Sequence, residues 1–108
     1  MELFTDEIIE RLTAQYDKGN FLSLQEVVCK IYNPYGLGIW YCINMDPSDK
    51  DYIWCIAHLY EWEIGSITRS ELESITMDEH GMELKRDLDW KPINAQDCWV
   101  RVANGETL

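Results

Sequence analysis

The stretch Glu61-Trp62-Glu63-Ile64-Gly65-Ser66-Ile67-Thr68-Arg69-Ser70-Glu71-Leu72-Glu73 decides the fold. Charged and apolar residues alternate over residues 61–64, which is the period of a β-strand. Gly65 is predicted to break that strand, because glycine permits a turn. Thr68 and Glu71 have the spacing of a capping box, so a helix is expected over residues 68–75. This succession of strand, break and capped helix indicates a domain that mixes strands with helices.

The composition indicates a small folded domain. A chain of 108 residues is long enough for one core and too short for two. A hydrophobic content of 46%, with five Trp and six Tyr, excludes a disordered chain. No apolar run approaches the ~20 residues that span a bilayer, and the first residues lack the regions of a signal peptide. We therefore expect one globular domain over residues 1–108, located in the cytoplasm.

The remaining elements follow from periodicity and turn residues. A helix is predicted over residues 5–17, an antiparallel meander over residues 25–64, and a short edge strand over residues 82–90. Within the meander, residues 61–64 continue or follow the third strand. The tail is ambiguous, because residues 97–102 resemble a strand whereas residues 94–97 can cap a short helix, and residues 105–108 are expected to fray. The predicted class is α+β, an antiparallel sheet of four to five strands with two or more helices packed on it.

Both faces of the third strand are apolar. Ile53 and Cys55 point to one side, while Trp54 and Ile56 point to the other. A sheet with one solvated face would show polar residues on that face. The second face is therefore either covered by helices or left as an aromatic binding patch. The aromatic residues concerned are Trp40, Trp54, Tyr60 and Trp62.

The net charge of −11, from 20 acidic and nine basic residues, is the strongest compositional feature. Direct binding to nucleic acid or to an anionic membrane is disfavoured, because the Lys and Arg residues are few and dispersed. The charge favours steered encounter with a basic partner, including proteins whose basic grooves hold DNA or RNA. The alternative is that the charge only keeps the chain soluble.

The cysteines and the aspartate-rich loop are interpreted as structural. Free buried thiols are expected at all four cysteines, because a cytosolic chain is kept reduced and three of them fall in apolar strand patterns. Zinc sites bring their ligands in close pairs, which are absent here. The loop at residues 46–51 lacks the spacing and the glycine of a calcium-binding loop, so a solvated turn is expected. No metal and no cofactor are predicted. The four cysteines are Cys29, Cys42, Cys55 and Cys98, and the aspartates of the loop are Asp46, Asp49 and Asp51.

No catalytic constellation is recognisable. Cys55 and His58 suggest a nucleophile and its base, but residues three apart on a strand face opposite ways. His58 is expected to be packed and His80 to be exposed in a loop. The pair Arg86-Asp87 is either a structural salt bridge or an anchor for a partner.

Several landmarks occur in a characteristic order. Trp40-Tyr41 is followed by Asp46-Pro47, then residues 64–67 lead into residues 70–75, and Gly81-Met82-Glu83-Leu84-Lys85-Arg86-Asp87-Leu88 comes last. This order resembles domain of unknown function 2958, a family of small proteins of bacterial plasmids and other mobile elements. Lys85 departs from the acidic residue that the family often has there. The resemblance implies a mobile-element setting and leaves the activity open.

The leading hypothesis is a non-enzymatic acidic protein that binds a basic nucleic-acid-handling protein as an anti-restriction or anti-CRISPR inhibitor, in the manner of a DNA mimic. Acids would steer the encounter and aromatic residues would anchor it. The predicted partner-binding residues are Glu61, Trp62, Glu63, Glu71, Glu73, Asp78, Glu79, Arg86, Asp87 and Asp89. The alternatives are a small hydrolase or nucleotide-modifying enzyme with an unrecognised cleft, and a self-associating accessory protein that forms a homodimer.

Overall fold

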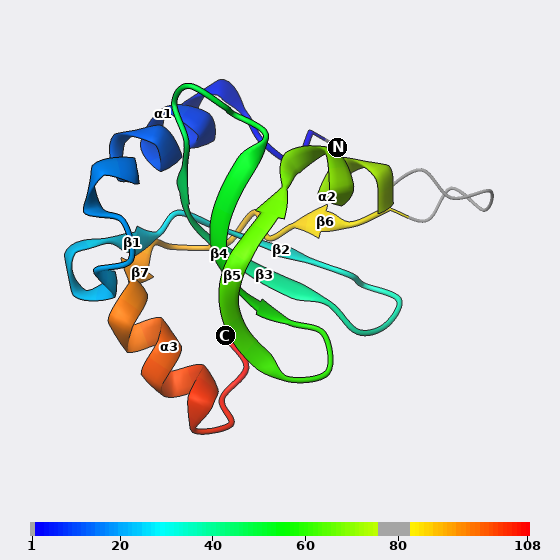
Figure 1. The fold of residues 1–108 in the computed structure, drawn as a ribbon. Coiled ribbons are helices and arrows are strands. Elements are labelled where there is room, and N and C mark those ends of the chain that lie inside the picture. Colours follow the sequence, from blue (N-terminus) through cyan, green and yellow to red (C-terminus); the bar gives the residue numbers. More distant parts are fainter. Residues whose placement is uncertain (1, 76–82) are drawn as a thin grey trace.

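The centre of the molecule is a five-stranded antiparallel sheet with the strand order β5-β4-β3-β2-β6 (Figure 1). The computed structural model describes residues 2–75 and 83–108. The strands of this sheet are β2 (Cys29–Tyr32), β3 (Ile39–Met45), β4 (Tyr52–His58), β5 (Trp62–Thr68) and β6 (Lys85–Arg86). A second sheet pairs β1 (Glu26–Val27) with β7 (Ile93–Asn94). The predicted α+β class with an antiparallel sheet of four to five strands is confirmed.

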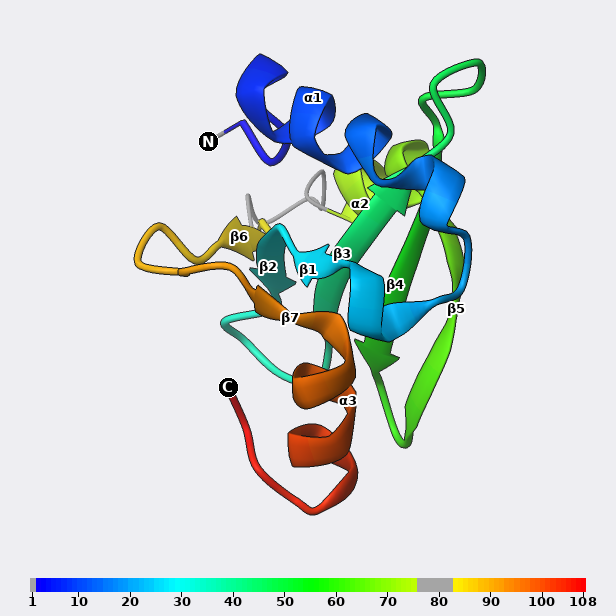
Figure 2. The same cartoon turned by 90° about the vertical axis from the view of Figure 1, so that its left-hand side faces the viewer.

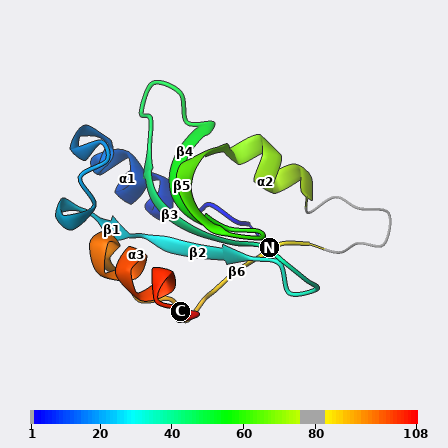
Figure 3. The ribbon, with the colours of Figure 1, turned by 60° about the horizontal axis from the view of Figure 1, so that its bottom comes forward.

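Helices cover both faces of the sheet (Figures 2 and 3). On one face lie α1 (Asp6–Ala14) and α2 (Arg69–Ile75), and on the other lies α3 (Ala95–Ala103). We call these the α1 face and the α3 face. The α1-face core includes Leu12, Ile31, Trp40, Ile53 and Leu72. The α3-face core includes Tyr41, Ile43, Ile56, Cys98 and Val102.

The burial of β4 confirms the prediction that both of its faces are apolar. Ile53 and Cys55 belong to the α1-face core, and Ile56 belongs to the α3-face core. Of the aromatic residues in question, Trp40 is buried, Trp54 and Trp62 are half-buried, and Tyr60 is 87% exposed. Helices therefore cover most of the second face, and α3 supplies the cover that the sequence left undecided.

A β-bulge in β3 changes which face its last residues occupy. Cys42 pairs with Cys55, but the next pair is Asn44 with Trp54, so Ile43 is the extra residue. Since the bulge adds one residue, it reverses the alternation of side chains. The adjacent residues Ile43 and Asn44 therefore lie on the same face, because Ile43 belongs to the α3-face core and Asn44 pairs with Trp54, which packs against that core.

Gln15 holds the bulge from the end of α1. Its Nε2 donates to the carbonyl of Ile43 at 2.7 Å and to the carbonyl of Glu26 at 3.0 Å. Its Oε1 accepts from the Glu26 amide at 2.8 Å. A bulge leaves backbone groups without their ladder partners, and buried backbone groups need a replacement. One side chain thus joins α1, β1 and the bulge of β3.

The prediction that Gly65 breaks the strand is wrong. Gly65 pairs with Cys55 inside β5, and the strand continues to Thr68. A Cβ added to Gly65 would meet no atom within 4 Å, so the glycine marks open space beside an extended backbone. The cap at Thr68 is confirmed, because its Oγ1 accepts from the Glu71 amide at 3.0 Å.

The aspartate-rich loop also contributes to the start of α2. Asp51 Oδ1 accepts from the amide and the hydroxyl of Ser70 at 2.8 and 2.5 Å. These hydrogen bonds lower the pKa of Asp51. A carboxylate is also favoured at the positive end of a helix. We predicted a solvated turn, and the loop in addition caps the first turn of α2 through Asp51.

The tail differs from two expectations. Residues 97–102 belong to α3 and not to a strand, because the Asn94 side chain accepts from the amides of Gln96 and Asp97 and caps a helix. Residues 105–108 are not frayed at their end. Leu108 packs on the α3-face core, and its carbonyl accepts from Lys30 Nζ and from the Tyr41 hydroxyl.

The other bounds are close to those expected. The helix predicted over residues 5–17 is α1 followed by a 3-10 turn at Tyr16–Lys18. The first strand of the meander is divided at Val28 into β1 and β2. Residues 61–64 follow the third strand, and Trp62, Glu63 and Ile64 form the first part of β5. Of the edge strand predicted over residues 82–90, only Lys85–Arg86 pairs with β2, and residue 82 lies outside the described residues.

Three of the cysteines form a row across the sheet. Cys29 pairs with Cys42, which pairs with Cys55, and all three belong to the α1-face core. All four cysteines are free and buried, as predicted. Contact with Cys29 and burial raise the pKa of Cys42, and burial raises the pKa of Cys55 and of Cys98 to about 12.

Alkaline pH is expected to destabilise the fold through these thiols. The unfolded chain loses the thiol protons near pH 9, whereas the folded chain keeps that of Cys55 to about pH 12. The contribution of each such thiol to the free energy of unfolding is therefore fully present below about pH 9. Above that pH it falls by up to about 1.4 kcal/mol per pH unit for each thiol. Urea unfolding under reducing conditions, measured from about pH 8 to pH 11, gives the slope.

Cys55→Ala should lower stability at pH 8 but make the alkaline decline shallower. Ile53→Val, on the same strand and face, is the matched control, because it removes buried volume without removing a titrating group. Equal slopes for the two variants would contradict a contribution from Cys55.

Candidate functional site

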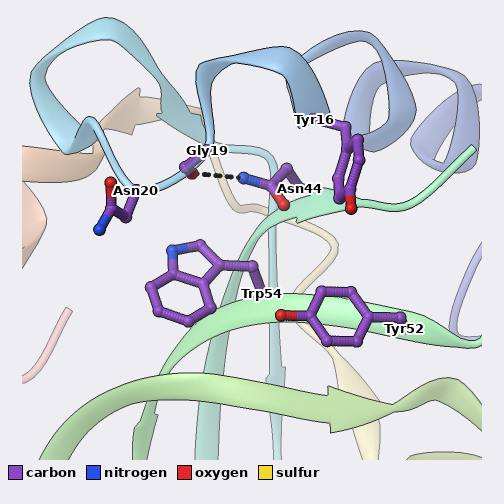
Figure 4. Close-up of a pocket in the computed structure, with 6 residues that line it drawn as sticks. All are labelled: Tyr16, Gly19, Asn20, Asn44, Tyr52 and Trp54. Atoms are coloured by element: carbon purple, nitrogen blue, oxygen red, sulfur yellow. Dashed lines mark hydrogen bonds between the residues drawn. The ribbon is translucent and has the colours of Figure 1, made fainter.

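An aromatic cavity opens between the end of α1 and the α3 face of β4. It has a volume of about 390 Å³ and is lined by Tyr16, Gly19, Asn20, Asn44, Tyr52 and Trp54 (Figure 4). Tyr52 and Trp54 are alternate residues of β4, so both project from the same face of that strand. Tyr16 faces them from the 3-10 turn after α1. Three aromatic side chains thus surround one small space.

The buried amide of Asn44 lines this cavity and is held by a second buried amide, that of Gln25. Asn44 and Gln25 are each 1% exposed. Asn44 Nδ2 donates to Gln25 Oε1 at 2.7 Å and to the Gly19 carbonyl at 3.0 Å, and Gln25 Nε2 donates to the same carbonyl at 3.0 Å. Gly19 has a φ of 56°, a conformation that favours glycine. The bulge and this network together fix the wall.

Trp54 carries a buried polar atom without a partner. Among the described residues, its Nε1 is the side-chain nitrogen or oxygen that is buried without a hydrogen bond. The nitrogen lies on the side of the ring toward Gly19 and Asn20 (Figure 4). Buried donors without an acceptor are rare in native proteins and cost stability. Packing of the ring, rather than a hydrogen bond, therefore positions this indole.

A carboxylate acts on one of the phenols that line the cavity. The charge of Asp46, together with burial and a hydrogen bond to its carboxylate, raises the pKa of the Tyr16 phenol. Hydrogen bonds from Ser48 lower the pKa of Asp46, so the carboxylate is ionised at neutral pH. No Lys or Arg lines the cavity. Anionic ligands are therefore disfavoured here, and neutral or cationic ligands are favoured.

The predicted partner-binding acids lie at two separate edges of the sheet. Glu61 and Glu63 lie at the start of β5, and Glu71 and Glu73 lie on α2, which follows β5. Asp87 and Asp89 follow β6 at the opposite edge, about 19 Å away across four strand spacings. Asp78 and Glu79 lie outside the described residues.

Other predicted site residues make contacts within the fold. Arg86 Nη1 donates to the carbonyls of Glu2 and Leu3, so this side chain holds the N-terminal segment. Glu73 pairs with Arg69 at 2.6 Å. Trp62 is half-buried and stacks on Tyr41 and on His58, with ring centroids 5.8 and 4.0 Å apart.

The histidine and cysteine of β4 do not meet. Cys55 lies in the α1-face core, whereas His58 stacks on Trp62 on the other side of the sheet. His80 lies outside the described residues. Across residues 2–75 and 83–108, no group of three or more His, Cys, Asp or Glu residues could hold a metal ion. None of the helices in this part of the chain is long and apolar enough to cross a bilayer.

Sequence reasoning missed the cavity. The sequence indicates Trp54 as a member of a possible aromatic patch, but it does not indicate that Trp54 shares a cavity with Tyr16 and Tyr52. The available signal was Asn44, an amide in the otherwise apolar run Ile39–Met45. A buried amide must find partners, which points to a polar wall nearby. The bulge that directs Asn44 toward Trp54 has no sequence signature of its own.

Trp54→Phe is expected to be less destabilising than Trp90→Phe. Both variants replace a half-buried indole with a smaller ring. Trp90 Nε1 donates to the Val27 carbonyl at 3.0 Å, whereas Trp54 Nε1 has no acceptor among the described residues. The difference should be about 1–2 kcal/mol in the free energy of unfolding, because only Trp90→Phe leaves a backbone acceptor unpaired. Urea unfolding of both variants measures it. A larger loss for Trp54→Phe would show that its N–H has a partner in solution.

Comparison with known proteins identifies the family alone. The model of a family described as protein of unknown function (DUF2958) matches residues 3–107. No curated protein and no solved structure matches this chain. The match spans all of the strands and helices described above and agrees with the order of landmarks in the sequence. The chain therefore belongs to the DUF2958 family.

Proposed function

We propose that this chain is a non-enzymatic acidic protein that binds a basic, nucleic-acid-handling protein through the β5 edge of its sheet. The free edge of β5, flanked by exposed acids, is the observation that carries the proposal. An anti-restriction or anti-CRISPR role, encoded on a mobile element such as a plasmid and exerted in the cytoplasm, belongs to the same proposal.

The charge distribution supports a basic partner. The chain carries a net charge of −11, and no Asp or Glu of the described residues is buried. Glu61 and Glu63 are exposed beside Tyr60, whose side chain is 87% exposed at the β4–β5 turn. Acids at the rim steer a basic protein, and an exposed aromatic ring supplies contact area. An acidic edge with an aromatic tip therefore suits a basic surface.

The backbone of β5 is available for pairing. No strand of the described residues lies on its outer side. The Arg69 amide donates to the Asp51 carbonyl at 2.7 Å, toward β4. Because residues of an antiparallel strand alternate in direction, the backbone groups that face away from β4 include those of Trp62, Ile64 and Ser66. A partner segment in extended conformation can add to this edge by hydrogen bonds between backbones.

A hollow beside Gly65 supplies a place for a partner's side chain. It has a volume of about 250 Å³, and its lining includes Trp40, Ala57, Glu63 and Gly65. The missing side chain at Gly65 leaves this space open. In strand addition, backbone bonds give affinity and such hollows give specificity. Glu63 at the hollow favours a side chain that carries a positive charge.

Charge reversal at the edge should abolish partner capture. The tagged protein is incubated with lysate of bacteria that carry restriction and CRISPR systems, and bound proteins are identified by mass spectrometry. We expect basic nucleic-acid-binding proteins that are released by excess duplex DNA. Glu61→Lys with Glu63→Lys should reduce capture by about tenfold or more, the effect of losing close charge pairs.

Glu7→Lys with Glu10→Lys, on the exposed side of α1, is the matched control, because it changes the net charge by the same amount. Equal losses for the two double variants would show that net charge alone matters. Capture that DNA does not compete would contradict a nucleic-acid-handling partner.

Ser66→Pro tests strand addition separately. The Ser66 amide faces away from β4, so proline there removes no hydrogen bond of the sheet and is tolerated on an edge strand. We expect a folded protein, as judged by circular dichroism and thermal unfolding, with capture reduced by about tenfold or more because the added strand loses a bond and meets the ring. Ser66→Ala is the control and should bind normally. Unchanged capture by a folded Ser66→Pro variant would exclude strand addition at β5.

A further inference from the structure

The aromatic cavity of Figure 4 lies outside the proposed protein-binding edge and carries an inference of its own. We propose that it binds a small organic cation of the quaternary or methylated ammonium class. The three aromatic side chains of the lining, the lack of lining Lys or Arg residues and the carboxylate of Asp46, which interacts with the Tyr16 phenol, support this chemistry. The proposal does not depend on the function proposed above.

The arrangement of the rings suits a cation. Tyr52 and Trp54 lie side by side along β4, and Tyr16 stands across the space from them (Figure 4). The face of an aromatic ring attracts a cation within about 6 Å of its centre, most strongly at Trp, and groups of such rings recognise quaternary ammonium ions. Tyr16 and Tyr52 remain 38% and 36% exposed, so a ligand can reach them from solvent.

The electrostatic surroundings select the sign of the ligand. Asp46 is ionised and lies close enough to the Tyr16 phenol to raise its pKa. The amide nitrogen of Asn44 is already bonded to Gln25 and Gly19, so this donor is engaged by the wall itself. A phosphate or carboxylate would meet a nearby carboxylate without a compensating cation. An ammonium group would instead gain from both the rings and the carboxylate.

The cavity is a built feature of the fold. Its wall depends on the β3 bulge, which places Asn44 beside Trp54, and on the positive φ of Gly19, whose carbonyl accepts from two buried amides. Bulges often occur next to functional sites, where they redirect a side chain. The volume of about 390 Å³ lies in the usual range of small-molecule sites.

Two sources share this chemistry, a free metabolite and a methylated lysine of another protein. The probes are therefore choline, its neutral isostere 3,3-dimethyl-1-butanol, and a short peptide with trimethyllysine beside the same peptide with unmodified lysine. Binding is followed by NMR at the indole N–H of Trp54 and at the backbone amides of Asn44 and Gly19. This readout assigns binding to the cavity even though the chain has five Trp residues.

We expect choline to shift these signals and to bind at least about tenfold more tightly than the isostere, since the isostere matches its shape but lacks its charge. Tyr52→Leu should weaken choline binding by about tenfold or more, and Asp46→Asn by several-fold. Tyr52→Phe keeps the ring and should bind. Tyr35→Leu, a ring 61% exposed on the β2–β3 turn, should leave binding unchanged.

Each result decides the proposal. Binding of the trimethyllysine peptide and not of choline would support the cation site and identify a protein as the source. Equal affinity for choline and the isostere would overturn it in favour of an apolar cavity. The absence of shifts with choline and with both peptides would also overturn it. Failure of the cation-site proposal would not affect the proposal for the β5 edge, because the β5 edge is tested separately, by protein capture with Ser66 and Glu63 variants.

Discussion

The bulge at Ile43 is the constraint on which the rest of the structure depends. One extra residue in β3 moves each following side chain of the strand to the opposite face of the sheet. Met45 therefore lies in the α1-face core, and Asn44 lies on the same face as Trp54. Without the bulge, an amide would point into an apolar core and a methionine would occupy the polar wall. Burial of an amide among apolar side chains without partners is costly. The bulge therefore lets one strand serve both cores and a polar site.

The side chains that stabilise the bulge lie before β1, 28 and 19 residues away in the sequence from their partners in β3. Gln15 satisfies the Ile43 carbonyl, and Gln25 accepts from Asn44. Both glutamines also bind backbone, Gln15 at Glu26 and Gln25 at Gly19. Fully satisfied polar networks of this kind rigidify a structure and specify one arrangement. The segment from α1 to β1 is thereby fixed against β3, and the aromatic cavity forms between them.

The β5 edge and the aromatic cavity differ in the kind of ligand that their chemical groups suit. The β5 edge offers backbone groups, acids and an exposed aromatic tip, which are features for a protein partner. The cavity offers ring faces around a small volume, which are features for a compact ligand. Other acids serve the fold, because Asp51 caps α2 while Glu26, Glu73 and Glu106 pair with Arg11, Arg69 and Arg101. The remaining acidic surface is what a partner would meet.

Much of the fold was predictable from local pattern. The antiparallel class, the two apolar faces of β4, the cap at Thr68 and the buried thiols all follow from periodicity and residue type, which act over a few neighbours. The errors concern residues whose state depends on distant contacts. Gly65 permits a turn, yet pairing with Cys55 keeps it extended. The tail matched both a strand and a helix until Asn94 capped α3 and Tyr41 bound Leu108.

The sequence by itself determined an acidic α+β chain of the DUF2958 family with an apolar core on each side of its central strands. Only the tertiary structure decided how the acids divide between the two edges of the sheet, that β5 is an edge strand among the described residues, and where the aromatic cavity lies. The reason is physical. Periodicity reports how a residue is placed relative to its near neighbours, whereas a bulge, a free edge and a cavity exist only through pairing between segments far apart in the chain.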